Sequence, residues 1–335
     1  MLIDDFLHKT QALLTAAVFL LAVVFSLNYA PKAQPRPPKI VLQSHQLAID
    51  TTNYYDYLRA FSIPLLAPEQ GEWRYYHHET EQSYAHYLLE EPITITAQRN
   101  KIYVLPLGDF SVDEKKLLTT TVDYLKAYFS VPIVLQTALP LAVLPATASR
   151  QRSTWTQYLT TYILNEVLVK NLPTDAATYI CLTNADLYPE ASWNFVFGQA
   201  YLHKRVGVWS LFRLKEYDEK QELVWQKSLK RVIDVAAHEL GHSFSMRHCV
   251  QYECVMNGSN SLEEGDRQPC LPCVECIAKL DHATKITNLQ RLEALRHFFE
   301  KEKLVKEAEL CATLITQVRK YEWLKTYYTY KALRM

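Results

Sequence analysis

Apolar and β-branched residues gather in short runs along the middle of the chain, a pattern typical of strands. These runs predict five strands, at residues 101–107, 131–135, 177–182, 195–200 and 206–212. The last two are separated only by a few residues near Arg205, which predicts a turn there. The segment between the second and third strands begins with a loop that we expect to extend to residue 152.

Apolar residues at helical spacing predict helices between and after these strands. Ser111 and Glu114 form a capping-box pattern at the start of the first helix. A second helix is predicted over 158–168, a third from about Leu229, and a long charged helix over 285–319. This order of elements predicts an α/β fold, in which a twisted mixed five-stranded sheet packs against the third helix.

Composition and charge exclude some classes of protein. A chain of 335 residues with only seven glycines can build one sizeable ordered core with appendages. Its 36 basic and 36 acidic residues cancel, whereas a nucleic-acid-binding module normally carries a basic excess for phosphate contacts. We therefore expect no nucleic-acid partner.

The N-terminus carries an uncharged apolar run over 12–27, followed by a proline-rich stretch. This run predicts an uncleaved single-pass membrane anchor, with a cleaved signal peptide and a buried helix as alternatives. Flanking basic residues favour a main domain that faces the cytoplasm, and export by a signal anchor stays open. We expect an anchor or signal segment at 1–30, a linker and extension at 31–98, a main domain at 99–300 and a helical tail at 301–335.

The predicted third helix carries the sequence HELGH, followed six residues later by another histidine. His238 and His242 are four residues apart, so both imidazoles lie on one face of the helix and can bind one metal ion. His248 follows the expected helix end and completes a three-nitrogen site if the chain turns back. Three protein ligands and one open position are the requirements of a catalytic zinc, with Glu239 placed to take a proton from a bound water.

Five of the seven cysteines lie within a short stretch after these histidines. Cys249, Cys254, Cys273 and Cys276 have spacings that suit a closed structural zinc site. Cys270 also forms a C-x2-C pair with Cys273 and competes for a ligand position. Disulfides and free core thiols are the alternatives. With the histidines, this pattern predicts two zinc ions per chain.

The histidine and cysteine motifs, with Met256 in a turn between them, resemble the archaemetzincin family of metzincin-clan zinc peptidases. The resemblance extends over roughly residues 70 to 300. It is carried most strongly by HELGHSFSMRHC at 238–249, CVMNGSNSLEE at 254–264 and CVECIAKL at 273–280.

This resemblance implies a metzincin-like zincin fold with a small C-terminal subdomain stapled by the second zinc. It implies peptide or protein substrates, a Met-turn at Met256 beneath the metal, and Glu239 as general base. The strand at 195–200 would be the sheet edge that binds an extended substrate, with Leu262 and Glu263 near the pocket after the scissile bond.

The sequence departs from the family pattern in two places. Ser245 stands where family members usually have glycine, the residue that lets the backbone leave the helix toward His248. A left-handed serine there would be strained, so we expect glycine at this position to raise stability. The distance from Met256 to the final cysteine pair is also one residue shorter than usual, which leaves the role of Cys270 open.

Other classes of function remain open at this point. A catalytically weak, zinc-stabilised peptide-binding protein is favoured by Ser245, although Glu239 is retained. A redox or metal-handling protein would use the C-x2-C pairs but would leave the histidine motif unexplained. The sequence does not name the substrate, the cleavage preference or the oligomeric state.

Overall fold

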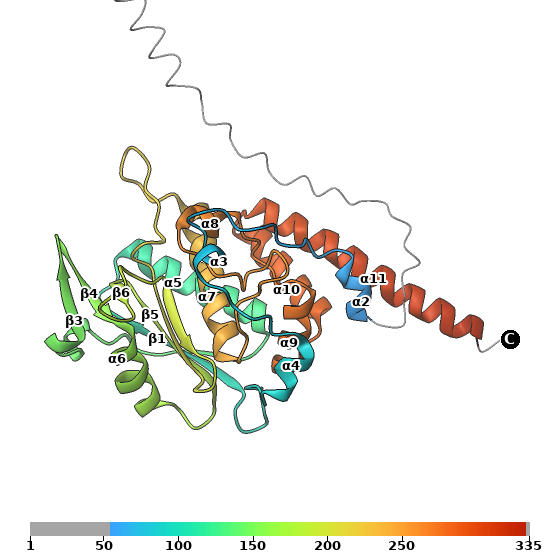
Figure 1. Ribbon diagram of the computed structural model, residues 1–335, viewed down its shortest axis with the longest axis horizontal. Helices are drawn as coiled ribbons and strands as arrows, with labels where there is room; N and C mark the ends of the chain where they lie inside the picture. Colours follow the sequence, from blue (N-terminus) through green and yellow to red (C-terminus); the bar gives the residue numbers. More distant parts are fainter. Residues whose placement is uncertain (1–53, 333–335) are drawn as a thin grey trace, which may run out of the picture. The chain divides into compact units, whose positions relative to one another are not determined.

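The central sheet is built from the five strand segments that the sequence predicts. The computed structural model describes residues 54–332 (Figure 1). The strand order of the central sheet is β2-β1-β5-β8-β7. Neighbouring strands are parallel except β7, which is antiparallel to β8 and forms one edge. The strands are β1 Lys101–Leu107, β2 Ile133–Leu135, β5 Ala176–Thr183, β7 Gly198–Tyr201 and β8 Val206–Ser210. The predicted mixed α/β fold is confirmed.

Alternate side chains of the central strand β5 enter two different cores. Ile180 packs with helices α5 (Val112–Phe129) and α7 (Trp225–Ser243) on one face of the sheet. Cys181 packs on the other face, against a π-helical segment at Ile163–Leu168. Every residue of β5 is buried because both faces are covered. Helix α7 begins four residues before the predicted start, and it lies beneath the sheet as expected.

A second, smaller sheet corrects the prediction for the region before β5. Its strands are β3 Ser149–Arg152, β4 Trp155–Leu159 and β6 Asp186–Tyr188. Tyr158 and Leu159, predicted to be helical, pair instead with residues of β6. This pairing joins residues far apart in the sequence, so local periodicity could not reveal it. Only a short helix α6 (Thr160–Tyr162) and the π-helical segment remain of the predicted helix.

The predicted long C-terminal helix is interrupted. Helix α10 (Asn288–Lys301) and helix α11 (Val305–Ala332) pack against each other instead of forming one rod. The chain reverses at Lys303, which has a φ of 60°, and the backbone N–H of Leu304 donates to Phe299 O. Apolar spacing continues through this reversal, so the pattern predicted a single helix.

The described residues that precede β1 run along the surface of the C-terminal half of the chain. Three short helices, α2 (Tyr54–Arg59), α3 (Trp73–Tyr76) and α4 (Tyr84–Leu89), lie in this stretch. Helices α2 and α4 pack against α9 (Val274–Thr284). Between α2 and α3, Ile63 and Leu65 exchange backbone hydrogen bonds with Glu253 and Gln251. The N-terminal stretch is thereby fixed beside the cysteine-rich loop.

The predicted membrane localisation is contradicted. Across residues 54–332, no helix is long and apolar enough to cross a bilayer. The apolar run at 12–27, on which the predicted anchor rested, lies outside the described residues. Neither the single-pass anchor nor the membrane as a partner has support among the described residues.

Candidate metal centre and substrate cleft

Three imidazoles converge at the C-terminal end of α7. Nitrogen atoms of His238, His242 and His248 all lie within 4.8 Å of one another. Nδ1 of His238 is 2.9 Å from the carbonyl oxygen of Val255, and Nδ1 of His242 is 2.6 Å from that of Met246. A carbonyl can only accept, so both Nδ1 atoms carry the proton and both Nε2 lone pairs face the centre.

Burial keeps the imidazoles of His238 and His242 neutral. Desolvation, reinforced by the neighbouring His248, lowers the pKa of His238 to about 3. Desolvation also lowers the pKa of His242 well below its ordinary value, with His238 and His248 adding to the effect. Neutral imidazole is the form that binds a metal ion, so the donor set fits zinc.

The third histidine reaches the centre because the chain leaves α7 through a left-handed residue. Ser245 has a φ of 68°, and the N–H of Met246 donates back to Gly241 O. The Ser245 hydroxyl is buried, donates to Leu202 O at 2.6 Å and accepts from the N–H of Ile93 at 3.1 Å. The left-handed exit predicted for this position is confirmed, and its side chain links three segments of the chain.

Glu239 lies beside this centre against the edge strand. Its side chain is buried, and Oε2 has no hydrogen-bond partner among the described residues. Burial raises the pKa of Glu239 to about 8. A Cβ at Gly198 of β7 would lie 2.5 Å from Oε1 of Glu239, so only glycine leaves room for the carboxylate. Sequence reasoning did not identify this role of Gly198.

The loop that follows the three histidines forms a tight turn beneath them. Met256 is buried, and a Cβ at Gly241 would lie 2.4 Å from its sulfur. The Asn257 side chain donates to Cys249 O at 2.7 Å and accepts from the N–H of Cys254 at 2.8 Å. The glycine inside HELGH therefore makes room for the methionine, and Asn257 holds the turn.

The four predicted cysteine ligands form a second cluster. The sulfur atoms of Cys249, Cys254, Cys273 and Cys276 lie within 4.8 Å of one another, and all four residues are buried. Hydrogen bonds from the other three thiols lower the pKa of Cys249, so the cluster already favours a thiolate. All seven cysteines are free, and Cys270 is not in the cluster. None of these cysteines is joined in a disulfide, and Cys270 is a buried thiol outside the cluster.

A cleft of about 720 Å³ opens in front of the histidines. Residues 193–200 line one side, and α7 together with the loop after Met256 lines the other. Leu262 lies in this lining, as predicted, whereas Glu263 does not. Trp73 from the N-terminal stretch also contributes to the lining.

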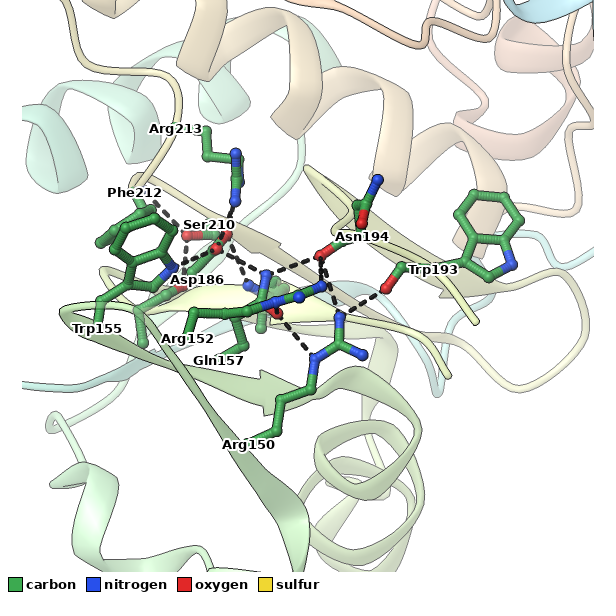
Figure 2. A network of polar contacts seen from close by, with 12 residues as sticks. Arg150, Arg152, Trp155, Gln157, Asp186, Trp193, Asn194, Ser210, Phe212 and Arg213 are labelled. Atoms are coloured by element: carbon green, nitrogen blue, oxygen red, sulfur yellow. Dashed lines mark hydrogen bonds and ion pairs between the residues drawn. The ribbon is translucent and has the colours of Figure 1, made fainter. Parts of the chain in front are cut away.

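A polar network around the buried side chains of Asp186 and Gln157 supports the side of the cleft that leads into β7 (Figure 2). Asp186 accepts two hydrogen bonds from the Arg213 guanidinium, at 2.8 and 2.7 Å. Trp155 Nε1 and Gln157 Nε2 also donate to Asp186, at 3.0 and 2.8 Å. The small sheet and the end of β8 are thereby tied to one carboxylate.

The same network fixes backbone groups of the cleft rim. Arg150 donates to the carbonyl oxygens of Trp193 and Asn194, at 2.6 and 3.0 Å, and Gln157 donates to Asn194 O at 2.9 Å (Figure 2). Trp193 and Asn194 both line the cleft. No sequence pattern pointed to this network, because its members come from three separated strands and loops.

The sequence matches known proteins over the region that builds these sites. The sequence model of peptidase family M54 matches residues 156–282. Archaemetzincin-2 from Rattus norvegicus is 30% identical over 271 residues, covering 71% of this chain and 75% of the relative. Archaemetzincin from Pyrococcus furiosus is 31% identical over 186 residues, covering 55% of this chain and 93% of the relative. A solved structure of archaemetzincin from Archaeoglobus fulgidus, complexed with malonate, is 31% identical, with a TM-score of 0.42. The match covers 53% of this chain and 99% of that one.

Archaemetzincin-2 from Homo sapiens matches over a similar extent, at 28% identity over 270 residues, 71% of this chain and 75% of the relative. The expected family resemblance is thus confirmed over most of the chain's length. The chain belongs to the archaemetzincin family of zinc metallopeptidases.

Proposed function

We propose that this protein hydrolyses peptide bonds with a zinc ion held by His238, His242 and His248. The observation that carries the proposal is the convergence of these three imidazoles beside the unpartnered carboxylate oxygen of Glu239, at the base of a cleft. Three nitrogen ligands leave one coordination position open, which distinguishes a catalytic from a structural zinc site.

The bound zinc would supply a water with a pKa near 7 and would polarise the scissile carbonyl. Glu239 is the general base: its free Oε2 accepts the proton from the attacking water and returns it to the leaving amine. Gly198 keeps that carboxylate close to the edge strand, where a substrate backbone would lie. His238 and His242 keep their Nε2 lone pairs toward the centre through the carbonyls that bind Nδ1.

The substrate is an extended peptide that lies along β7. β7 is an edge strand of the central sheet, so one side of its backbone is not paired within that sheet. An extended peptide can add to such an edge through main-chain hydrogen bonds. Phe195 and Phe197 line the cleft beside this edge, which supports apolar contacts to the substrate.

Cys249, Cys254, Cys273 and Cys276 hold a second, structural zinc, for a total of two ions per chain. Four buried sulfur atoms at this spacing suit a closed tetrahedral site. Such a zinc would join the loop of Met256 to the first turn of α9, and would therefore support the floor of the catalytic centre.

The alternative of a catalytically weak binding protein rested on Ser245. That residue takes the left-handed conformation and His248 reaches the other imidazoles, which supports catalysis over binding alone. No feature of the described residues favours binding without hydrolysis.

Substitution of the general base tests the proposal. Glu239→Gln should reduce peptide hydrolysis by at least about a hundredfold while both zinc ions stay bound, because Glu239 is a base and not a ligand. Hydrolysis is followed by mass spectrometry on a peptide mixture, and metal content by elemental analysis. Glu263→Gln, in the same chain but outside the cleft lining, is the matched control and should keep full activity. More than a few per cent residual activity in the Glu239 variant would exclude the general-base role.

A further inference from the structure

The third histidine has a partner that the other two lack. Nδ1 of His248 lies 2.8 and 3.0 Å from the two carboxylate oxygens of Glu79. His238 and His242 instead bind backbone carbonyls of the loop that follows α7. Glu79 precedes His248 by 169 residues and comes from the N-terminal stretch.

We propose that Glu79 is a positioning residue for His248, and that residues 63–80, which we name the strap, complete the catalytic metal site. This inference rests on the proposed function, because it assigns His248 as a zinc ligand. A carboxylate can only accept, so Nδ1 of His248 carries the proton and its Nε2 lone pair faces the other imidazoles. A charged acceptor also makes the imidazole a stronger ligand than a neutral carbonyl does.

The Glu79 carboxylate is itself held in place. Trp73 Nε1 donates to Oε2 of Glu79 at 3.1 Å. The Trp73 ring meets the His248 ring edge-on at 5.1 Å between centroids, and it stacks on His77 at 3.8 Å. The imidazole of His248 is thus restrained by a hydrogen bond and by an aromatic contact, both from the strap.

The strap is anchored at several points and can therefore transmit a fixed geometry. Ile63 and Leu65 form backbone hydrogen bonds with Glu253 and Gln251. In addition, the N–H of Trp73 donates to the Glu264 side chain at 2.9 Å. A Cβ at Gly258 would lie 2.4 Å from the Trp73 ring, so the indole fits against bare backbone next to the Met256 turn. The strap thus packs on the same turn that lies beneath the metal site.

Glu79 is not placed to bind the metal itself. Both of its oxygens contact Nδ1 of His248, the nitrogen opposite Nε2 on the ring. Glu79 is also not part of the cluster formed by the ligand atoms of His238, His242 and His248. Its action on the metal would therefore pass through the imidazole. The competing interpretation is a surface ion pair that contributes only to folding.

Zinc affinity of the full-length protein separates these interpretations. Glu79→Ala should weaken binding of the catalytic zinc by about 10- to 100-fold in competition with a chromogenic chelator. Glu79→Gln keeps an acceptor but not the charge, and it should lie between Glu79→Ala and the wild type. Glu81→Ala removes an exposed carboxylate two residues away and should leave the affinity unchanged. Cobalt substitution reports the two sites separately, since only the cysteine site gives thiolate charge-transfer bands.

Two further measurements make each outcome decisive. His248→Ala should lose the catalytic zinc, and retention of that zinc would overturn the proposed function itself. Loss of zinc in His248→Ala together with wild-type affinity in both Glu79 variants would overturn only the positioning role. Melting temperatures of the zinc-free proteins give the second test. A lower value for Glu79→Ala with unchanged zinc affinity would mean that the contact is structural, and would also refute the proposal.

Discussion

Replacing Ser245 by glycine tests how the chain leaves helix α7. From the sequence alone, glycine should stabilise the protein, because it would relieve the backbone strain of a serine in the left-handed conformation. The structure confirms the left-handed conformation, with φ at 68°, but it also reveals two hydrogen bonds of the hydroxyl, to Leu202 O and from the N–H of Ile93. We now expect Ser245→Gly to destabilise the protein.

The magnitude follows from three opposing contributions to the free energy of unfolding. Relief of the left-handed backbone stabilises by about 1–2 kcal/mol. The greater freedom of glycine in the unfolded chain costs about 0.4–1 kcal/mol. Loss of the hydroxyl removes one hydrogen bond from a carbonyl and one from an N–H, both partly buried, at about 0.5–1.5 kcal/mol for each bond. At the middle of each range, the three contributions sum to a net loss of about 1 kcal/mol for Ser245→Gly.

Ser245→Ala is the matched control, because it removes the hydroxyl but keeps the Cβ that causes the strain. We expect it to be less stable than Ser245→Gly by up to about 1 kcal/mol. Urea unfolding of the zinc-loaded proteins, compared at equal m-values, measures both differences. A glycine variant at least as stable as the wild type would show that the hydroxyl contacts contribute less than the strain. Equal stability of the alanine and glycine variants would show that relief of the backbone strain only offsets the greater freedom of glycine in the unfolded chain.

Two further changes test the cysteine site and the fit of the general base. Cys254→Ser should release about one zinc per chain and lower the melting temperature by several degrees, whereas Cys270→Ser should keep both ions; equal zinc loss in the two variants would place Cys270 among the ligands. Gly198→Ala should lower kcat/KM by about 10- to 100-fold with zinc retained, because the added Cβ displaces the Glu239 carboxylate. Gly265→Ala, whose Cβ would have only an ordinary contact at 3.4 Å, is the control, and equal activity of the two variants would contradict this steric account.

Local sequence spacing was sufficient for the parts of the site that lie on one helix or one turn. The four-residue interval between His238 and His242 determines their common face once the segment is helical. Strand β1 was predicted to the residue, and the Ser111 capping box forms as expected. The clustered cysteines also converge, because the short loop between the pairs keeps their backbones near one another. In each case the interacting residues are close along the chain or follow a regular period.

Errors arose where a distant partner decides the local conformation. Residues 158–159 have apolar spacing compatible with a helix, but pairing with β6 makes them a strand. The reversal at Lys303 depends on packing between α10 and α11, which the continuous apolar pattern does not encode. Intrinsic preference is a weak guide in such segments, since tertiary contacts override it.

The same distinction applies inside the candidate site and explains why Glu79 was not identified from the sequence. The residue lies in a polar segment with no helical or strand period, and its contact with His248 bridges 169 positions. The features around it are equally nonlocal: Gly258 leaves space for the Trp73 ring, and Glu264 accepts from the Trp73 N–H. The convergence of the donor atoms could therefore be predicted from their spacing. The groups that contact those side chains are selected by the fold, and only the folded chain shows that Glu79 and Trp73 contact His248.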